Sequence, residues 1–146
     1  MLWRYAAAIV LIFGTVFIHT ACTALALGWL RSLHRRHWAL RSAWARASAL
    51  AGLVVMMSIA ASIESGMWAG FYVLTGALDT LDDALYFSLV TFTTLGYGDV
   101  TLHGQWRSFS AMEAVNGVIL FGWTTALIVA ASQRLFLHRQ PGEPDS

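Results

Sequence analysis

Residues 93–99 of the chain read Thr93-Thr94-Leu95-Gly96-Tyr97-Gly98-Asp99. Glycine adopts positive φ at little steric cost, so two glycines around a tyrosine indicate a tight return of the backbone. The residues before this stretch favour a helix, because a plausible N-cap at Asp79-Thr80 precedes acids in the first turn and an apolar run. The pattern predicts a short helix over 81–93, followed by an irregular return over 94–99.

Long apolar stretches flank this segment, and each is long enough to cross the hydrocarbon layer, which takes about 20 helical residues. They run from about 5 to 30, from 47 to 78 and from 109 to 137. The short helix and its return lie between the second and the third stretch. Irregular backbone is not tolerated against lipid, so the return is expected to line a cavity or to sit within protein.

The composition supports a membrane protein. Of the 146 residues, 58% are hydrophobic and 12% are charged, which is more apolar surface than a soluble domain of this size can hide. No nucleophile–base pair and no three-ligand metal set stands out in the sequence. We therefore expect an all-α membrane protein with three transmembrane helices, and not an enzyme.

The charges are separated along the chain. All basic residues are arginines, and five of them fall in one connection: Arg31, Arg35, Arg36, Arg41 and Arg46. Four acids fall in another: Asp79, Asp82, Asp83 and Asp99. Because basic loops stay on the cytoplasmic side, the arginine-rich connection predicts an N-terminus outside and a C-terminus inside. The same arginines fit either binding of anionic lipid headgroups or a role in topology alone.

The stretch 93–99 closely resembles the potassium-channel signature TTVGYGD and departs from it at Leu95, where Val or Ile is usual. The resemblance covers about 47–132 and is to bacterial channels related to two-transmembrane potassium channels. It implies a re-entrant pore helix, a selectivity-filter loop and a homotetrameric channel, with no cofactor beyond the permeant K⁺ and with other copies of the chain as partners. The expected location is a bacterial inner membrane.

The resemblance assigns roles to the filter residues. The K⁺ ligands are the backbone carbonyls, and those expected to bind it are Thr94, Leu95, Gly96, Tyr97 and Gly98. Thr93 and Asp99 are expected to support the filter and its outer mouth. Gly96 and Gly98 are expected at positive φ, and the ring of Tyr97 is expected to pack on aromatics such as Tyr86 and Phe87. One loop cannot enclose an ion, so a cyclic oligomer is required.

The chain divides into an extra N-terminal span (1–30), the arginine-rich connection (31–46), a pore domain (47–137) and a short disordered tail (138–146). In the inner helix, expected over 109–137, Gly117 is interpreted as a hinge. The alternative is that Gly117 and Gly122 only permit close helix packing. Helical spacing places these residues on the cavity side: Val118, Phe121, Thr125 and Val129.

Other polar residues lie within the spans. Glu64 and Glu113 are candidate modulatory carboxylates, and the alternative is a hydrogen-bonded structural pair. Glu113 is expected to face the pore helix or the outer helix, away from the ion path. His19 and Cys22 share one helix face, but two ligands are too few for a zinc site, so packing is the expected role. Trp3, Trp68 and Trp106 fit interfacial anchoring.

Two other functions remain compatible with the sequence. A cation channel of relaxed selectivity has the same fold, with the filter loosened by Leu95. A membrane assembly subunit that does not conduct is the other, although such a subunit has no need for an intact Gly96-Tyr97-Gly98. The sequence does not identify the gating stimulus.

Overall fold

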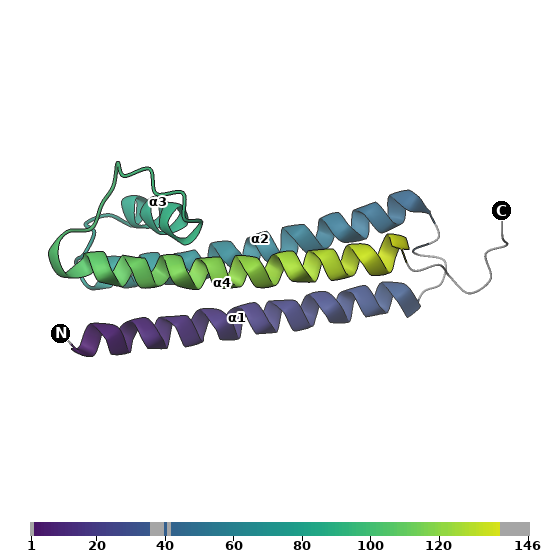
Figure 1. Ribbon diagram of the computed structural model, residues 1–146, viewed down its shortest axis with the longest axis horizontal. Helices are drawn as coiled ribbons and strands as arrows, with labels where there is room; N and C mark the ends of the chain where they lie inside the picture. Colours follow the sequence, from purple (N-terminus) through teal and green to yellow (C-terminus); the bar gives the residue numbers. More distant parts are fainter. Residues whose placement is uncertain (1, 36–39, 41, 138–146) are drawn as a thin grey trace.

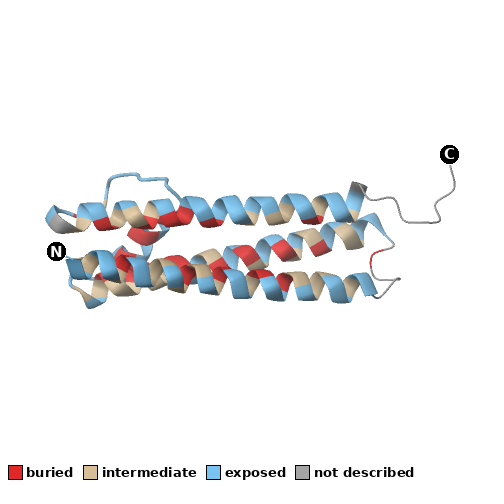
Figure 2. Cartoon of the chain, turned by 60° about the horizontal axis from the view of Figure 1, so that its bottom comes forward, coloured by how far each residue is buried: buried red, intermediate tan, exposed pale blue. Residues whose placement is uncertain are grey.

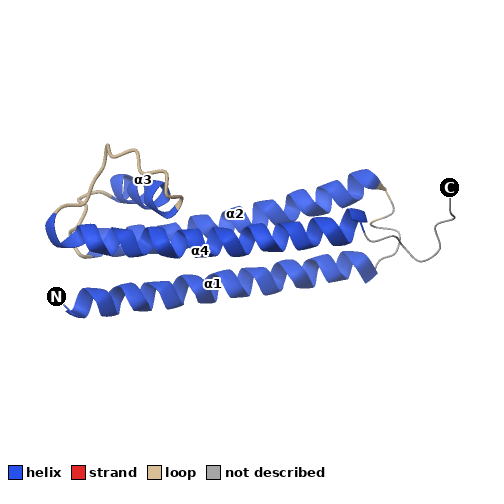
Figure 3. Ribbon diagram, in the orientation of Figure 1, coloured by secondary structure: helices blue, strands red, loops and turns tan. Residues whose placement is uncertain are grey.

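A computed structural model describes residues 2–35, 40 and 42–137, and in these residues it contains helices and no strands. The helices are α1 (Leu2–Arg35), α2 (Ala43–Leu74), the short α3 (Leu81–Phe92) and α4 (Arg107–Ser132) (Figures 1 and 3). A 3₁₀ turn, η1 (Gly104–Trp106), leads into α4, and a π-helical turn, η2 (Gln133–Leu137), follows it.

The three long helices run side by side, with α3 against one side of the α2/α4 pair and α1 against the other (Figure 1). The N-terminal end of α1 lies at the same end of the molecule as α3 and its loop. All three long helices are apolar and long enough to cross a membrane. The expected all-α membrane fold is thereby confirmed.

Several expected boundaries were wrong. The helix α1 continues to Arg35 and α2 begins at Ala43, so Arg31, Arg35 and Arg46 are helical rather than part of a loop. The helix α2 ends at Leu74, because a turn with Gly76 at φ 65° follows it. Arg36, Arg41 and the tail 138–146 lie outside the described residues.

The remaining boundaries are close to those expected. The helix α3, expected as the pore helix, ends at Phe92, one residue early, with Thr93 as its C-cap, and α4 begins at Arg107, two residues early. The α-helical part of α4 stops at Ser132, where the π-helical turn takes over. Thr80 is the N-cap of α3, since its hydroxyl accepts a hydrogen bond of 3.1 Å from the backbone N–H of Asp83.

The larger core lies at the end that carries α3. Trp68 and Tyr72 of α2 meet Phe109 of α4 through edge-to-face ring contacts at 5.3 and 5.9 Å between ring centroids. Trp68 is fully buried, so its expected interfacial role was wrong. At the other end, a smaller cluster joins α1, α2 and α4: Ala26, Leu53, Met57 and Ala131. Buried residues form narrow stripes on the inward faces, and the outward faces are exposed (Figure 2).

Candidate functional site: the loop after the pore helix

The loop that contains Gly96 and Gly98 directly follows the C-terminal end of α3 and is hydrogen-bonded to it. The backbone N–H groups of Leu95 and Gly96 both donate to the carbonyl of Val90, at 2.9 and 3.2 Å. The N–H of Thr94 donates to the carbonyl of Thr91 at 2.9 Å. This pairing is the Schellman pattern of helix termination. The start of the loop is therefore fixed relative to α3 by the last carbonyls of that helix.

Positive φ angles occur where the loop needs them. Gly96 and Gly98 have φ of 56° and 80°, as the sequence predicts. Thr94 has φ of 60° and is the one non-glycine residue with positive φ in the described part of the chain. It occupies the left-handed position of the Schellman pattern, where glycine is usual, so it holds a conformation that costs about 1–2 kcal/mol.

Asp99 closes the loop by returning to α3. The hydroxyl of Tyr86 donates a hydrogen bond of 2.6 Å to Asp99 Oδ2. This bond is the largest cause of two shifts: it lowers the pKa of Asp99 below 3.8 and raises the pKa of Tyr86 above 10.0. The sequence suggested that Tyr97 would pack on Tyr86 and Phe87. The structure instead pairs Tyr86 with Asp99 and packs the buried Phe87 edge-to-face on Tyr72.

The loop and the expected cavity stripe are open to the outside of this single chain. The exposed fractions of Leu95 and Tyr97 are 56% and 67%. Thr93, Thr94, Gly96 and Gly98 are exposed as well. The four residues predicted for the cavity side of α4 are also exposed: Val118, Phe121, Thr125 and Val129.

Gly117 is the contact point between α4 and the end of α3. A Cβ atom placed on Gly117 would lie 2.0 Å from the carbonyl oxygen of Phe92. A Cβ on Gly122 would meet nothing within 4 Å. Close packing therefore accounts for Gly117 and does not account for Gly122 within this chain. The rings of Phe92 and Phe121 meet edge-to-face near this contact, at 5.9 Å between centroids.

Glu113 of α4 packs against α3 and is fully buried. Its Oε2 accepts a hydrogen bond of 2.6 Å from the hydroxyl of Tyr72 on α2, and its Oε1 is in hydrogen-bond contact with Ser88 of α3. The expectation that Glu113 faces the pore helix and the outer helix agrees with this geometry. The expected pair with Glu64 is not formed, because Glu64 bonds to His19 instead.

The hydrogen bonds of the Glu113 cluster indicate which of its oxygen atoms carries a proton. Ser88 Oγ lies 2.6 Å from the carbonyl oxygen of Ser65 and also contacts Glu113 Oε1. Ser88 has one hydroxyl proton and cannot donate to both acceptors. A proton on Glu113 Oε1 satisfies every contact, since Glu113 then donates to Ser88 and Ser88 donates to Ser65. The cluster joins α2, α3 and α4 at one buried point.

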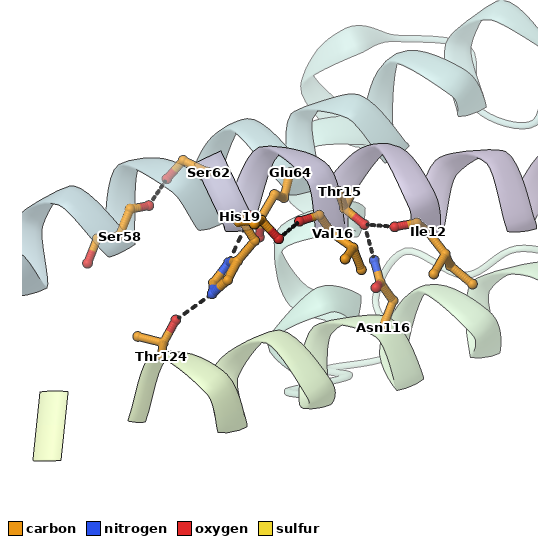
Figure 4. A network of polar contacts seen from close by, with 10 residues as sticks. Ile12, Thr15, Val16, His19, Ser58, Ser62, Glu64, Asn116 and Thr124 are labelled. Carbon is orange, nitrogen blue, oxygen red and sulfur yellow. Dashed lines mark hydrogen bonds and ion pairs between the residues drawn. The ribbon is translucent and has the colours of Figure 1, made fainter. Parts of the chain in front are cut away.

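A second buried polar network ties α1 to the bundle (Figure 4). His19 Nδ1 lies 2.9 Å from Glu64 Oε1 on α2, and His19 Nε2 lies 3.3 Å from Thr124 Oγ1 on α4. The side-chain amide of Asn116 donates a hydrogen bond of 2.7 Å to Thr15 Oγ1 of α1. Cys22 is only partly buried. In the described residues no group of three His, Cys, Asp or Glu side chains could hold a metal ion.

Residues 51–134 match the family model described as an ion channel, a family with two transmembrane helices. The match spans more than half of the chain. The chain belongs to this ion-channel family. The matched part of the channel begins in α2 and runs through α3 and its loop to the end of α4, so the first long helix lies outside it. Neither the curated proteins nor the solved structures give a match.

Sequence reasoning found the loop but missed the hydrogen-bond partners of Asp99 and of the buried polar side chains Glu113, Thr15 and His19. These partners are Tyr72, Tyr86, Ser88, Asn116 and Thr124. Asn116 and Thr124 leave a signal that was available, because polar residues inside long apolar spans pair with one another. The tyrosines leave no such signal, since an aromatic residue at helical spacing equally predicts packing.

Proposed function

We propose that four copies of this chain form a potassium-selective channel, with K⁺ bound by the backbone carbonyls of Thr94, Leu95, Gly96, Tyr97 and Gly98. The observation that carries the proposal is the loop conformation: a TTLGYGD sequence leaves a short helix through a Schellman turn and holds both glycines at positive φ. Such a loop presents carbonyl oxygens in succession, and these replace the hydration shell of K⁺.

Exposure of the loop supports a tetramer. One chain leaves Leu95 and Tyr97 more than half exposed, and irregular backbone does not face lipid. Closing identical loops around an axis by rotation buries them without any other partner. The negative end of the α3 dipole then points toward the ion path and favours a cation there.

The proposed orientation places the loop and the N-terminus outside and the C-terminus in the cytoplasm of a bacterial cell. Support comes from Arg31, Arg35 and Arg46, which lie near the end of the bundle opposite the acidic loop. The same arginines are proposed to contact anionic headgroups of the inner leaflet. At that level the Arg46 guanidinium lies 5.8 Å from the Phe136 ring centroid.

Purified protein in liposomes tests the proposal. We expect K⁺ efflux down its gradient that is blocked by Ba²⁺, an ion close to K⁺ in size. A Gly96→Ala variant that assembles normally serves as the matched control and is expected to show no efflux. Efflux that Ba²⁺ leaves unchanged would point to a less selective cation pathway. No efflux from well-assembled protein would point to a subunit that does not conduct.

A further inference from the structure

The helix α1 lies outside the part of the chain that matches the channel family, yet it buries three polar side chains in the bundle. Thr15, His19 and Thr23 have exposed fractions of 0%, 1% and 8%. Polar side chains at membrane depth are costly, and they are retained where they serve a function. A helix that served only as an additional anchor needs none of them.

His19 connects three helices. It bridges Glu64 of α2 and Thr124 of α4, and its ring meets the Trp123 ring edge-to-face at 5.4 Å between centroids. Among the described residues, Glu64 is the titratable group that α2 presents to His19, while α4 presents Thr124 and Trp123. Glu113, the other buried acid of α4, is engaged by Tyr72 and Ser88. On α1 itself, Cys22 lies one turn away.

The pair of His19 and Glu64 is electrically neutral when the two side chains share one dissociable proton. Its net charge is then zero, whether the proton sits on the imidazole or on the carboxylate. Loss of that proton leaves a net negative charge in surroundings that penalise it, and Glu64 Oε2 has no hydrogen-bond partner to spread that charge. The loss also removes the Nε2–H donor of the bond to Thr124, so this bond forms again only if the threonine hydroxyl turns to donate.

The position of Thr124 gives this change a mechanical consequence. Thr124 follows Gly117 by seven residues, so it lies beyond the point where α3 presses on α4. The helix α1 lies on the side of α4 opposite to α3 (Figure 1). The bond from His19 to Thr124 therefore holds the far half of the inner helix toward the side away from the pore helix.

We propose that α1 is a proton-responsive control helix, in which the His19–Glu64 pair and the His19–Thr124 hydrogen bond hold the inner helix in its open position, and loss of the shared proton releases it. This proposal rests on the proposed channel function for its readout in flux. Release is expected as the pH rises, because the shared proton is then lost, and K⁺ flux falls with it.

The experiment measures K⁺ flux from liposomes and thermal unfolding in detergent, each from about pH 6 to about pH 8.5. In wild type we expect flux to fall by about fivefold or more, the lower end of ordinary coupling between sites. The unfolding temperature is expected to fall over the same range. His19→Gln keeps hydrogen-bonding groups and removes the titration, so both profiles are expected to flatten. His34→Gln, the same change at the exposed end of α1, is expected to match wild type.

The variant Thr124→Val separates the coupling of His19 to α4 from proton binding by the His19–Glu64 pair. It removes the bond to α4 and leaves His19 and Glu64 together, so we expect a flat flux profile and a wild-type thermal profile. A His19→Gln variant with wild-type pH profiles would overturn the proposal, as would a wild type without pH dependence in either measurement. Absence of K⁺ flux at every pH would overturn the channel function instead, and the thermal profiles would still decide whether the pair binds the proton.

Discussion

Gly117 of α4 packs directly on the carbonyl group of Phe92, the last residue of the pore helix. Even a methyl group at Gly117 would lie 2.0 Å from Phe92 O and 2.8 Å from the carbonyl carbon. Because both atoms belong to the backbone, rotation of a side chain does not relieve the overlap. Helix α4 and the end of α3 therefore approach this closely because Gly117 has no side chain.

Gly117→Ala is expected to displace α3 and to destabilise the chain by about 1–3 kcal/mol or more, the usual cost of overpacking. The variant is expected to lose K⁺ flux and to unfold at lower temperature, as measured in liposomes and by thermal denaturation. Gly122→Ala is the matched control, since its Cβ meets nothing within 4 Å in the chain. Equal damage from both changes would contradict a special role for the Gly117–Phe92 contact.

Gly98→Ala tests the left-handed backbone of the loop. Its added Cβ meets nothing within 4 Å, so the expected cost of about 1–2 kcal/mol per chain comes from φ of 80° alone. We expect K⁺ flux to be lost with assembly largely retained. Gly104→Ala imposes the same kind of strain, at φ of 58°, outside the loop. That variant is expected to conduct selectively, and selective flux through Gly98→Ala would show that the loop is not the filter.

Tyr86→Phe removes the hydroxyl that holds Asp99. Both groups are at the surface of the chain, so little change in unfolding temperature is expected, whereas flux at neutral pH is expected to fall because the outer end of the loop is released. The lowered pKa of Asp99 means that the bond contributes above that pKa and is lost as the pH falls through it. The difference between wild type and variant is therefore expected to close in strong acid. Tyr5→Phe, on the exposed face of α1, is the control.

Glu113→Gln is expected to conduct, because an amide reproduces the protonated acid: its NH₂ donates to Ser88 and its oxygen accepts from Tyr72. Glu113→Ala leaves the buried Tyr72 hydroxyl without its partner, while Ser88 keeps the Ser65 carbonyl, and is expected to cost about 1–3 kcal/mol for the group left unpaired. Flux and thermal unfolding of the two variants are the measurements. If Glu113→Gln were as damaged as Glu113→Ala, a carboxylate that carries charge would be required instead.

The sequence predicted the elements of the fold well, for reasons that differ between residues. Apolar length predicts spans, the N-cap at Thr80 predicts the start of α3, and glycine chemistry predicts positive φ at Gly96 and Gly98. Helix ends near arginines were predicted poorly. Charged residues such as Arg35 and Arg46 favour helix as readily as loop once the chain leaves the hydrocarbon layer.

The sequence predicted the loop of the candidate site but not the hydrogen-bond partners of the buried side chains Glu113 and His19. The partners of Glu113 and His19 lie 25 to 105 residues away along the chain. Their pairing depends on how three helices rotate against one another, and no local pattern encodes that rotation. The positive φ of Thr94 was likewise unpredicted, because a threonine in a left-handed conformation is disfavoured unless surrounding hydrogen bonds impose it.

The reversal potential across a planar bilayer with K⁺ on one side and Na⁺ on the other tests the central claim most directly. A filter of carbonyl rings is expected to hold the reversal potential near the value for K⁺ alone, with little contribution from Na⁺. A reversal potential near zero would contradict potassium selectivity. It would indicate instead that the filter, loosened by Leu95, passes both ions.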